Sequence, residues 1–186
     1  MISLKNVSFS YVPGSPVLTD FSLAIPEGKR LCLYGESGRG KTTVLRLLMG
    51  LEKPDKGSIE MPEGLRFSAV FQEDRLLPWL NIAENAAMFA EKEKARRILC
   101  ELGLEELLKA MPDELSGGQR RRASLARALA HEGDVFLLDE PLTGLDQKNE
   151  ESALSLIDRI AADKTLILVS HHQQHAERLG AEMVRL

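Results

Sequence analysis

Short apolar runs alternate with segments of helical pattern along most of the chain. The strands predicted from these runs span residues 2–11, 17–25, 31–34, 58–61, 65–71, 135–138 and 166–169. Helical spacing of apolar residues follows from Thr43 and again over 147–162. Apolar strands that alternate with helices predict an α/β fold, in which a mostly parallel sheet is covered on both faces.

The middle of the chain interrupts this rhythm with an excess of helix. Residues 81–110 are helical in pattern, and Ser116 is placed to cap a further helix that runs to about His131. We therefore predict a single domain over residues 1–186, with a small α-helical subdomain at about 73–131 inserted into its core.

Composition excludes several classes of protein. The chain has 24 basic and 28 acidic residues and a net charge of −4, so it lacks the basic surface of a nucleic-acid-binding protein. Cys32 and Cys100 form no CxxC pair, which argues against a disulfide framework or a zinc site. No stretch approaches the ~18 consecutive apolar residues of a membrane span. We expect a protein of the reducing cytoplasm, held at a membrane only through a partner.

A phosphate-binding motif lies between a predicted strand and a predicted helix. Residues 35–42 read Gly-Glu-Ser-Gly-Arg-Gly-Lys-Thr and match GxxxxGK[ST] in full. Its glycines let backbone N–H groups turn toward an anion, and the helix N-terminus adds partial positive charge. Lys41 is then placed to reach the terminal phosphates and the Thr42 hydroxyl to bind Mg²⁺. The alternative, a glycine-rich turn that contains a lysine by chance, does not explain the flanking strand and helix.

Two carboxylates follow the apolar strand 135–138. Adjacent side chains point to opposite faces of a strand, so Asp139 and Glu140 can hold different roles. Asp139 is predicted to meet the Mg²⁺ shell and Glu140 to polarise the water that attacks the γ-phosphate. An exposed acidic strand end is the alternative, and the phosphate-binding motif makes it the weaker one.

A second glycine-containing motif, Leu-Ser-Gly-Gly-Gln at 115–119, resembles the signature sequence of ATP-binding cassette (ABC) ATPases. A serine cap followed by two glycines at a helix start is also a second anion site by its own chemistry. The order of the motifs fits the same family across essentially the whole chain. The resemblance implies a P-loop NTPase core with an N-terminal antiparallel β subdomain and the inserted helical subdomain.

The resemblance also assigns roles to residues outside these motifs. It implies that Tyr11 stacks on adenine, that Gln72 links Mg²⁺ and the attacking water to the partner protein, and that His171 lies near the γ-phosphate. Leu145 and Asp146 correspond to the loop that crosses to the other subunit. The predicted ATP contacts are Tyr11, Gly35, Ser37, Gly38, Gly40, Lys41, Thr42, Thr43, Ser116, Gly117, Gly118 and Gln119. The predicted Mg²⁺ ligands are Thr42, Gln72 and Asp139, and the predicted catalytic residues are Lys41, Gln72, Glu140 and His171.

The segment 71–80 resembles the corresponding stretch of importers for nitrate, sulfonates and taurine. Shortly after Gln72 this segment contains an apolar run, residues 76–80, which includes the only tryptophan of the chain, Trp79. It is therefore a candidate docking patch for a membrane subunit. In the alternative, Leu77, Trp79 and Leu80 belong to the core of the helical subdomain.

The resemblance predicts an ATP hydrolase whose two copies hold ATP head-to-tail and energise solute import through a transmembrane permease. It implies a homodimer at the inner face of the cell membrane and an extracytoplasmic substrate-binding protein in the same system. One alternative is a soluble ABC ATPase of a complex-assembly or remodelling system. Another is a regulatory nucleotide-binding module without turnover, which the presence of Gln72, Glu140 and His171 disfavours.

Two clusters of charged or metal-binding residue types have ordinary explanations. His171, His172 and His175 have no acidic or thiol ligand beside them in the sequence, so a metal site is not expected. The basic run at 120–122 is expected to be a solvated helix face.

Overall fold

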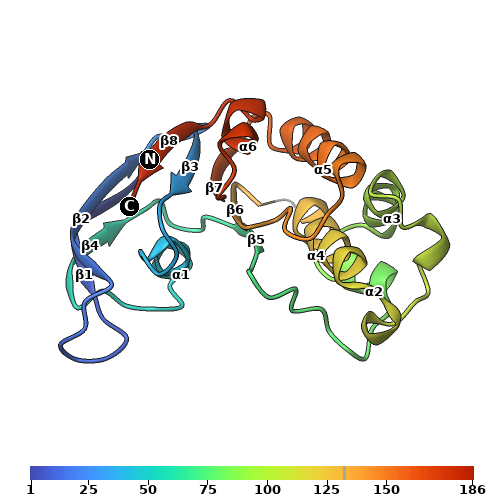
Figure 1. The fold of residues 1–186 in the computed structure, drawn as a ribbon, viewed down its shortest axis with the longest axis horizontal. Coiled ribbons are helices and arrows are strands. Elements are labelled where there is room, and N and C mark those ends of the chain that lie inside the picture. The colour runs from blue at the N-terminus through green and yellow to red at the C-terminus, as the bar shows by residue number, and fades with distance from the viewer. Residues whose placement is uncertain (132) are drawn as a thin grey trace.

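A computed structural model of the chain, which describes residues 1–131 and 133–186, contains two sheets and six α-helices among those residues (Figure 1). The strands are β1 (Ile2–Phe9), β2 (Leu18–Ile25), β3 (Arg30–Tyr34), β4 (Lys56–Glu60), β5 (Phe67–Val70), β6 (Val135–Asp139), β7 (Thr165–Val169) and β8 (Glu182–Arg185). The α-helices are α1 (Lys41–Leu48), α2 (Ile82–Ala86), α3 (Lys92–Glu101), α4 (Gly117–Ala130), α5 (Gln147–Ile160) and α6 (Gln173–Arg178). Two 3₁₀ turns span Glu105–Leu107 and Pro112–Glu114.

The central sheet has the order β5-β6-β7-β3-β8, and every neighbouring pair is parallel. Both of its faces are buried. In β6, Val135 and Leu137 belong to one hydrophobic cluster, whereas Phe136 and Leu138 belong to the other. This explains why β6 is apolar at every position rather than at alternate ones. The predicted parallel sheet with helices on both faces is confirmed.

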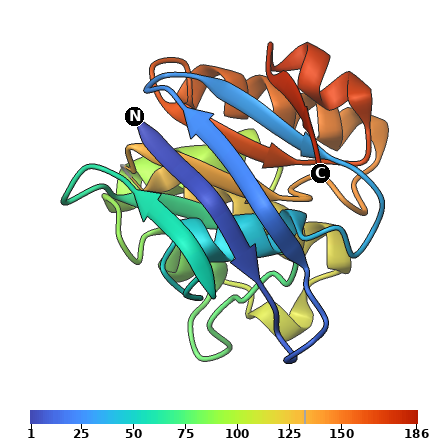
Figure 2. The same cartoon turned by 90° about the vertical axis from the view of Figure 1, so that its left-hand side faces the viewer.

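A second sheet, of order β2-β1-β4, is antiparallel and lies beside the first (Figure 2). One face of β1 is buried through Ile2, Leu4 and Val7. These residues share a cluster with α1, and the same cluster contains side chains of β3, β6 and β7. Helix α1 therefore packs between the two sheets, which confirms the predicted N-terminal antiparallel β subdomain and places the start of α1 close to both.

The predicted continuous helical pattern over 81–110 is wrong in detail. Asn81 begins α2 with a capping box, but α2 ends at Ala86, and Glu91 adopts an extended backbone that separates it from α3. The Asn85 side chain donates hydrogen bonds to the carbonyls of Leu77, Leu80 and Asn81. It therefore fixes the loop that precedes α2. Helices α2, α3 and α4 share one hydrophobic cluster. The division of the chain into a core and a 73–131 subdomain stays a prediction.

Two elements near the end of the chain were not predicted. Helix α6 has six residues, and β8 is an edge strand whose residues are exposed or half-buried. An edge strand that is only partly buried does not need a continuous apolar run, so the pattern that revealed β6 and β7 is absent from β8.

The parallel order of the central sheet decides where the functional segments lie. Because all five strands point the same way, their carboxyl ends meet at one edge. Gly35 follows β3, Gln72 lies beyond β5, Glu140 follows β6, and His171 follows β7 after one residue. Four segments that are far apart in the sequence thus converge at this edge.

Candidate active site

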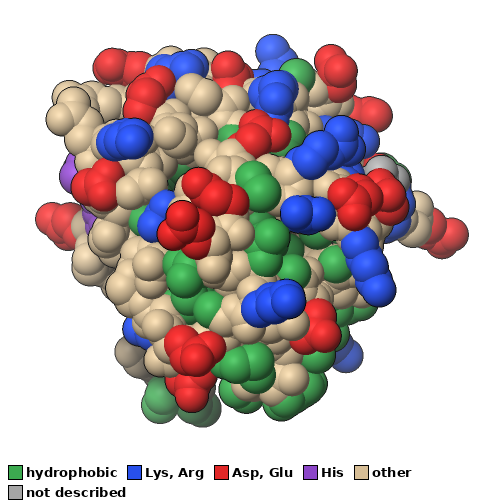
Figure 3. Space-filling view, turned by 90° about the vertical axis from the view of Figure 1, so that its right-hand side faces the viewer, with side chains coloured by type: hydrophobic (Ala, Val, Ile, Leu, Met, Phe, Trp, Pro, Cys, Tyr) green, Lys and Arg blue, Asp and Glu red, His purple; other side chains and the backbone are tan. Residues whose placement is uncertain are grey.

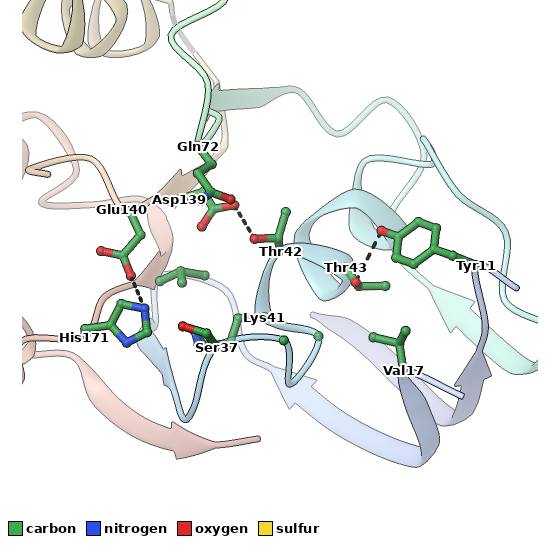
Figure 4. Close-up of a pocket in the computed structure, with 13 residues that line it drawn as sticks. Tyr11, Val17, Ser37, Lys41, Thr42, Thr43, Gln72, Asp139, Glu140 and His171 are labelled. Atoms are coloured by element: carbon green, nitrogen blue, oxygen red, sulfur yellow. Dashed lines mark hydrogen bonds and ion pairs between the residues drawn. The ribbon is translucent and has the colours of Figure 1, made fainter. Parts of the chain in front are cut away.

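A cavity of about 410 Å³ lies at the carboxyl edge of the central sheet (Figure 4). Eleven of the predicted site residues line it, namely Tyr11, Ser37, Gly38, Gly40, Lys41, Thr42, Thr43, Gln72, Asp139, Glu140 and His171. Val17 and Val169 complete its lining. The fold therefore brings together the phosphate-binding motif, the two carboxylates, the glutamine and the histidine around one space.

The phosphate-binding loop is shaped for an anion. Gly40 has a φ of 89° and stands immediately before α1 without a side-chain cap, so the first backbone N–H groups of the helix are free of a capping partner. A Cβ at Gly40 would lie 2.9 Å from Leu18 and 3.0 Å from Val17, which explains the glycine. The Lys41 ammonium donates hydrogen bonds to the carbonyls of Gly35 (2.8 Å) and Glu36 (2.9 Å). The loop thus holds the lysine at the mouth of the cavity, although Gly35 itself does not line it.

Thr42 and Asp139 place two oxygen atoms side by side that could bind a metal ion. The Thr42 hydroxyl donates a 2.7 Å hydrogen bond to Asp139 Oδ2. Burial raises the pKa of Asp139, while the Thr42 hydrogen bond and the charges of Arg121 and Lys41 act in the opposite direction. A hydroxyl and a carboxylate this close are the hard ligands that Mg²⁺ prefers, so these residues fit that ion.

Glu140 lies on the other side of the cavity with His171. Its Oε1 atom is 3.2 Å from His171 Nε2. The geometry does not make a hydrogen bond, so Oε1 is buried without a donor. Burial raises the pKa of Glu140, and the neighbouring Asp139 adds to this, whereas His171 opposes it. Glu140 lines the cavity, and a carboxylate in this position can accept a proton from a water molecule there.

Tyr11 lines the end of the cavity opposite Glu140. Its ring is half exposed and stands edge-on to Phe9 at 4.8 Å, and its hydroxyl is 3.3 Å from Thr43 Oγ1. An accessible aromatic ring beside the phosphate-binding helix can stack on a flat base. Its predicted stacking on adenine remains a prediction.

The signature residues lie outside this cavity. Ser116 caps α4 by accepting a hydrogen bond from the Gln119 amide, and the Gln119 side chain accepts one from the Ser116 amide. Gly117 and Gly118 line a second cavity, of about 630 Å³, which shares Gln72, Glu140 and His171 with the first. None of the predicted ATP contacts at 116–119 lines the cavity of the phosphate-binding loop.

One residue of the site was misjudged from the sequence. The run 120–122 was predicted to be solvated, but Arg121 is only 4% exposed. Its guanidinium bonds backbone carbonyls of both the β6 end and the loop after β5. A run of charged residues predicts that a helix face is exposed on average. Whether one of these residues is buried depends on segments that are distant in sequence. The sequence therefore carried no signal for it.

Among the histidines near residue 171, His175 has two side-chain partners. His175 is buried between Ser170 Oγ (2.8 Å from Nδ1) and Glu150 Oε1 (3.1 Å from Nε2). Within residues 1–131 and 133–186, no group of three or more His, Cys, Asp or Glu side chains is placed to hold a metal ion.

Trp79 does not belong to the core. Its exposed fraction is 70%, although Leu77 and Leu80 beside it are half-buried. The alternative that placed Trp79 inside the helical subdomain is therefore wrong. Its bulky apolar side chain is accessible for contact with another protein.

This arrangement of a glycine-rich loop, a lysine and two carboxylates at a parallel-sheet edge defines a P-loop nucleotide hydrolase. Residues 18–143 match the protein family described as "ABC transporter". The aliphatic sulfonates import ATP-binding protein SsuB 1 of Rhodococcus jostii is 41% identical over 178 residues, which cover 91% of this chain and 73% of that protein. The thiamine import ATP-binding protein ThiQ of Haemophilus influenzae is 37% identical, with 87% and 83% covered. The chain belongs to the ABC transporter family.

Solved structures agree with this assignment. The dimeric structure of the bacterial ABC transporter cassette MJ0796 superimposes with a TM-score of 0.89 at 28% identity, covering all of this chain and 94% of that one. A second dimeric structure of MJ0796, in a post-hydrolysis state bound to ADP and Pi, superimposes equally well. The chain is thus an ABC-type ATP hydrolase, and the predicted ABC ATPase fold is confirmed. The relatives favour a transporter subunit over the soluble assembly ATPase.

No helix in the described part of the chain combines the length and apolar character needed to cross a bilayer.

Proposed function

We propose that the chain is the ATP-hydrolysing subunit of an importer, acting as a homodimer beneath a transmembrane permease. The observation that carries this proposal is the convergence of Lys41, Thr42, Asp139, Glu140 and His171 on one cavity. The names of the relatives, sulfonate and thiamine import proteins, support the direction of transport. The proposal includes a place at the inner face of the cell membrane and an extracytoplasmic binding protein in the same system.

In this proposal the cavity holds ATP with Mg²⁺. The amides at the start of α1 and the Lys41 ammonium bind the phosphates, and Tyr11 receives the adenine ring. Thr42, Asp139 and Gln72 would hold Mg²⁺, which when bound neutralises charge on the phosphates. The glycines and Ser37 leave room for the triphosphate, since nothing lies within 4 Å of a Cβ placed at Gly38.

Hydrolysis then depends on Glu140. Its carboxylate lines the cavity and accepts a proton from the attacking water, which increases the nucleophilicity of that water toward the γ-phosphate. His171, 3.2 Å from Glu140 Oε1, fixes the orientation of the carboxylate and contacts the γ-phosphate. Gln72 orients the water from the loop after β5.

The second copy supplies the signature. Because none of the residues 116–119 lines the cavity of the phosphate-binding loop, the proposed dimer places this helix start against the partner's nucleotide. The helix dipole and the amides of Gly117 and Gly118 would then meet the γ-phosphate from the opposite side. The dimeric structures of MJ0796 support the association of two copies.

The permease would dock on exposed apolar side chains near the helical end of the molecule. Phe89, Met88 and Phe71 line a groove of about 440 Å³, and Phe89 is 68% exposed. The end of the molecule that carries α2 and α3 has hydrophobic side chains at its surface between charged ones (Figure 3). Trp79 lies on the loop that joins Gln72 to α2. A docked partner on this loop would sense movement of Gln72.

Co-expression with candidate membrane proteins from neighbouring reading frames tests the proposal. A detergent-stable complex should form, and its ATP hydrolysis should rise when the substrate-loaded binding protein is added. Lys41→Ala should leave the complex intact while abolishing hydrolysis. Failure of the wild-type chain to bind any membrane protein encoded beside it would contradict the transporter assignment and favour the soluble assembly ATPase.

Trp79→Ala is expected to weaken binding to the permease by about 30-fold, the effect of losing roughly 2 kcal/mol at an interface hot spot. Its melting temperature should not change, because the side chain is 70% exposed; a core tryptophan would instead lose about 3–5 kcal/mol of folding stability. Titration of the detergent-solubilised permease measures the affinity. Val12→Ala removes an apolar side chain of comparable exposure from another loop and should bind normally. Equal affinities for the two variants would remove Trp79 from the interface.

A further inference from the structure

Arg121 is an almost completely buried charged residue. It lies in the second turn of α4, and its side chain is 5% exposed. An arginine is seldom buried unless its donors are paired, since burial of an unpaired charge is strongly unfavourable. Its partners therefore indicate what the residue does.

One set of partners lies at the end of β6. Arg121 Nη2 donates to the carbonyls of Asp139 (2.6 Å) and Glu140 (2.5 Å), and Nε donates to the Glu140 carbonyl at 3.1 Å. Glu140 has a φ of 49°, a left-handed conformation that residues other than glycine rarely adopt. A guanidinium that grips the Glu140 carbonyl from two nitrogens stabilises this conformation, and the conformation in turn decides where the carboxylate points.

The other set of partners lies in the loop after β5. Nη1 donates to the Phe71 carbonyl at 2.6 Å, to the Gln72 carbonyl at 3.4 Å and to Asp74 Oδ1 at 3.2 Å. The same guanidinium thus contacts the backbone of Gln72 and that of Glu140. Its planar fork has a fixed geometry, so the two segments cannot shift relative to each other without loss of hydrogen bonds.

Arg127, two turns further along α4, holds the same loop but not β6. It donates to the carbonyls of Arg75 (2.7 Å) and Asp74 (3.2 Å). Arg122, the neighbour of Arg121, turns away from both segments and donates to the Leu102 carbonyl (2.7 Å) and to Asn149 Oδ1 (2.8 Å). The helix therefore offers two matched comparisons for Arg121.

We propose that Arg121 is a positioning residue that locks the strained backbone of Glu140 to the Gln72 loop, so that the general base and the water-orienting glutamine are held in register from the signature helix. The proposal rests on the catalytic roles given above to Glu140 and Gln72. It adds a direct mechanical connection. The helix whose N-terminus is the signature motif carries, one turn later, the side chain that aims the catalytic carboxylate.

Arg121→Met and Arg121→Lys test this proposal, with Arg122→Met and Arg127→Met as comparisons. We expect Arg121→Met to lower kcat for ATP by about 10²-fold, the effect of a displacement of about 1 Å in a catalytic group, with KM changed less than threefold. Arg121→Lys keeps the positive charge but can form fewer hydrogen bonds, so its kcat should lie between those of wild type and Arg121→Met. Arg122→Met should keep kcat within threefold of wild type. All rates are measured well below the melting temperature of each variant.

Hydrogen–deuterium exchange gives a readout that does not depend on activity. Arg121→Met should accelerate exchange at the amides of both 71–75 and 139–141, whereas Arg127→Met should accelerate it at 71–75 alone. Arg122→Met should accelerate neither. If Arg121→Met does not fold, Arg121→Lys is measured in the same way and should show both accelerations in weaker form.

The outcomes separate this proposal from the catalytic assignments on which it rests. A wild-type kcat, or unchanged exchange at 139–141, in Arg121→Met or Arg121→Lys overturns the positioning role while Glu140→Gln remains inactive. A fall in kcat that Arg122→Met matches at equal melting temperature would mean that the residue stabilises the fold only. Normal turnover of Glu140→Gln would overturn the roles of both residues.

Discussion

Replacement of Glu140 by glutamine is expected to reduce ATP turnover by about 10²–10⁴-fold, as for the loss of a general base. Glutamine has nearly the same shape as the Glu140 side chain that lines the cavity, but its amide cannot take a proton from water. ATP affinity should be retained, because the phosphate contacts are assigned to Lys41 and the amides of α1. Phosphate release measures turnover, and fluorescent-nucleotide titration measures affinity.

The same variant should trap the dimer. With ATP bound and not hydrolysed, two chains remain joined, so gel filtration with ATP should show a dimer that disappears when ATP is omitted. Unchanged hydrolysis in Glu140→Gln would exclude Glu140 as the base. Lys41→Ala provides the control, since it should neither hydrolyse ATP nor form the ATP-dependent dimer.

The pH dependence of hydrolysis gives an independent check on Glu140. Burial raises its pKa, so the acidic limb of the wild-type rate profile should lie above the usual carboxyl range of about 4.3. Stability should follow the same shift. A carboxyl with a raised pKa in the folded state destabilises the fold once pH rises through that pKa, so Glu140→Gln should melt at a higher temperature than wild type at pH 7. The difference should vanish below the unfolded-state pKa, where Glu140 is protonated in both states.

A mixture of Ser116→Arg and Lys41→Ala chains should regain hydrolysis that neither variant has alone. In the mixed dimer one composite site combines the intact Lys41 of one chain with the intact Ser116 of the other, and the second site carries both lesions. Each mixed dimer has one intact site out of two, so it should reach about half of the wild-type activity per dimer if a single intact site can turn over. Activity is measured over a range of mixing ratios and should peak near equal amounts.

Two observations decide the meaning of this experiment. Ser116 caps α4, and loss of a cap lowers stability by about 1 kcal/mol. Ser116→Ala therefore serves as the control for the loss of the cap alone. If mixed dimers form, as shown by two affinity tags, and the mixture stays inactive, the nucleotide sites are either not shared between subunits or not able to act singly.

The central sheet and the phosphate site were predictable because their signals are local and strong. Strands buried on both faces, such as β6 and β7, must be apolar at every position. The phosphate loop needs Gly40 and Lys41 at fixed places in the sequence. The parallel order of the strands alone places Asp139 and Glu140 at the carboxyl ends of the sheet. Partly exposed β8 and the short α2 carry weak local signals, and their bounds depend on contacts such as those of Asn85.

Arg121 shows the limit of sequence reasoning more sharply. Nothing in the run 120–122 distinguishes its members, yet Arg121 is buried against β6 and the Gln72 loop while Arg122 contacts Asn149. Its position is fixed by two segments about 20 and 50 residues away, and the helical phase of α4 selects which arginine meets them. The motif residues that line the cavity were predicted from the sequence, whereas the contacts of Arg121 with two of these segments required the fold.

The different environments of the two cysteines make this chain suitable for site-selective labelling in its native form. Cys32 lies fully buried in β3, and burial raises the pKa of its thiol to about 11, which leaves almost no reactive thiolate at neutral pH. Cys100 is exposed on α3. A maleimide dye should therefore attach at one place only, and with Trp79 as the sole tryptophan it forms a natural donor–acceptor pair. Movement of the docking loop relative to α3 during the ATP cycle could then be followed by energy transfer without a single substitution.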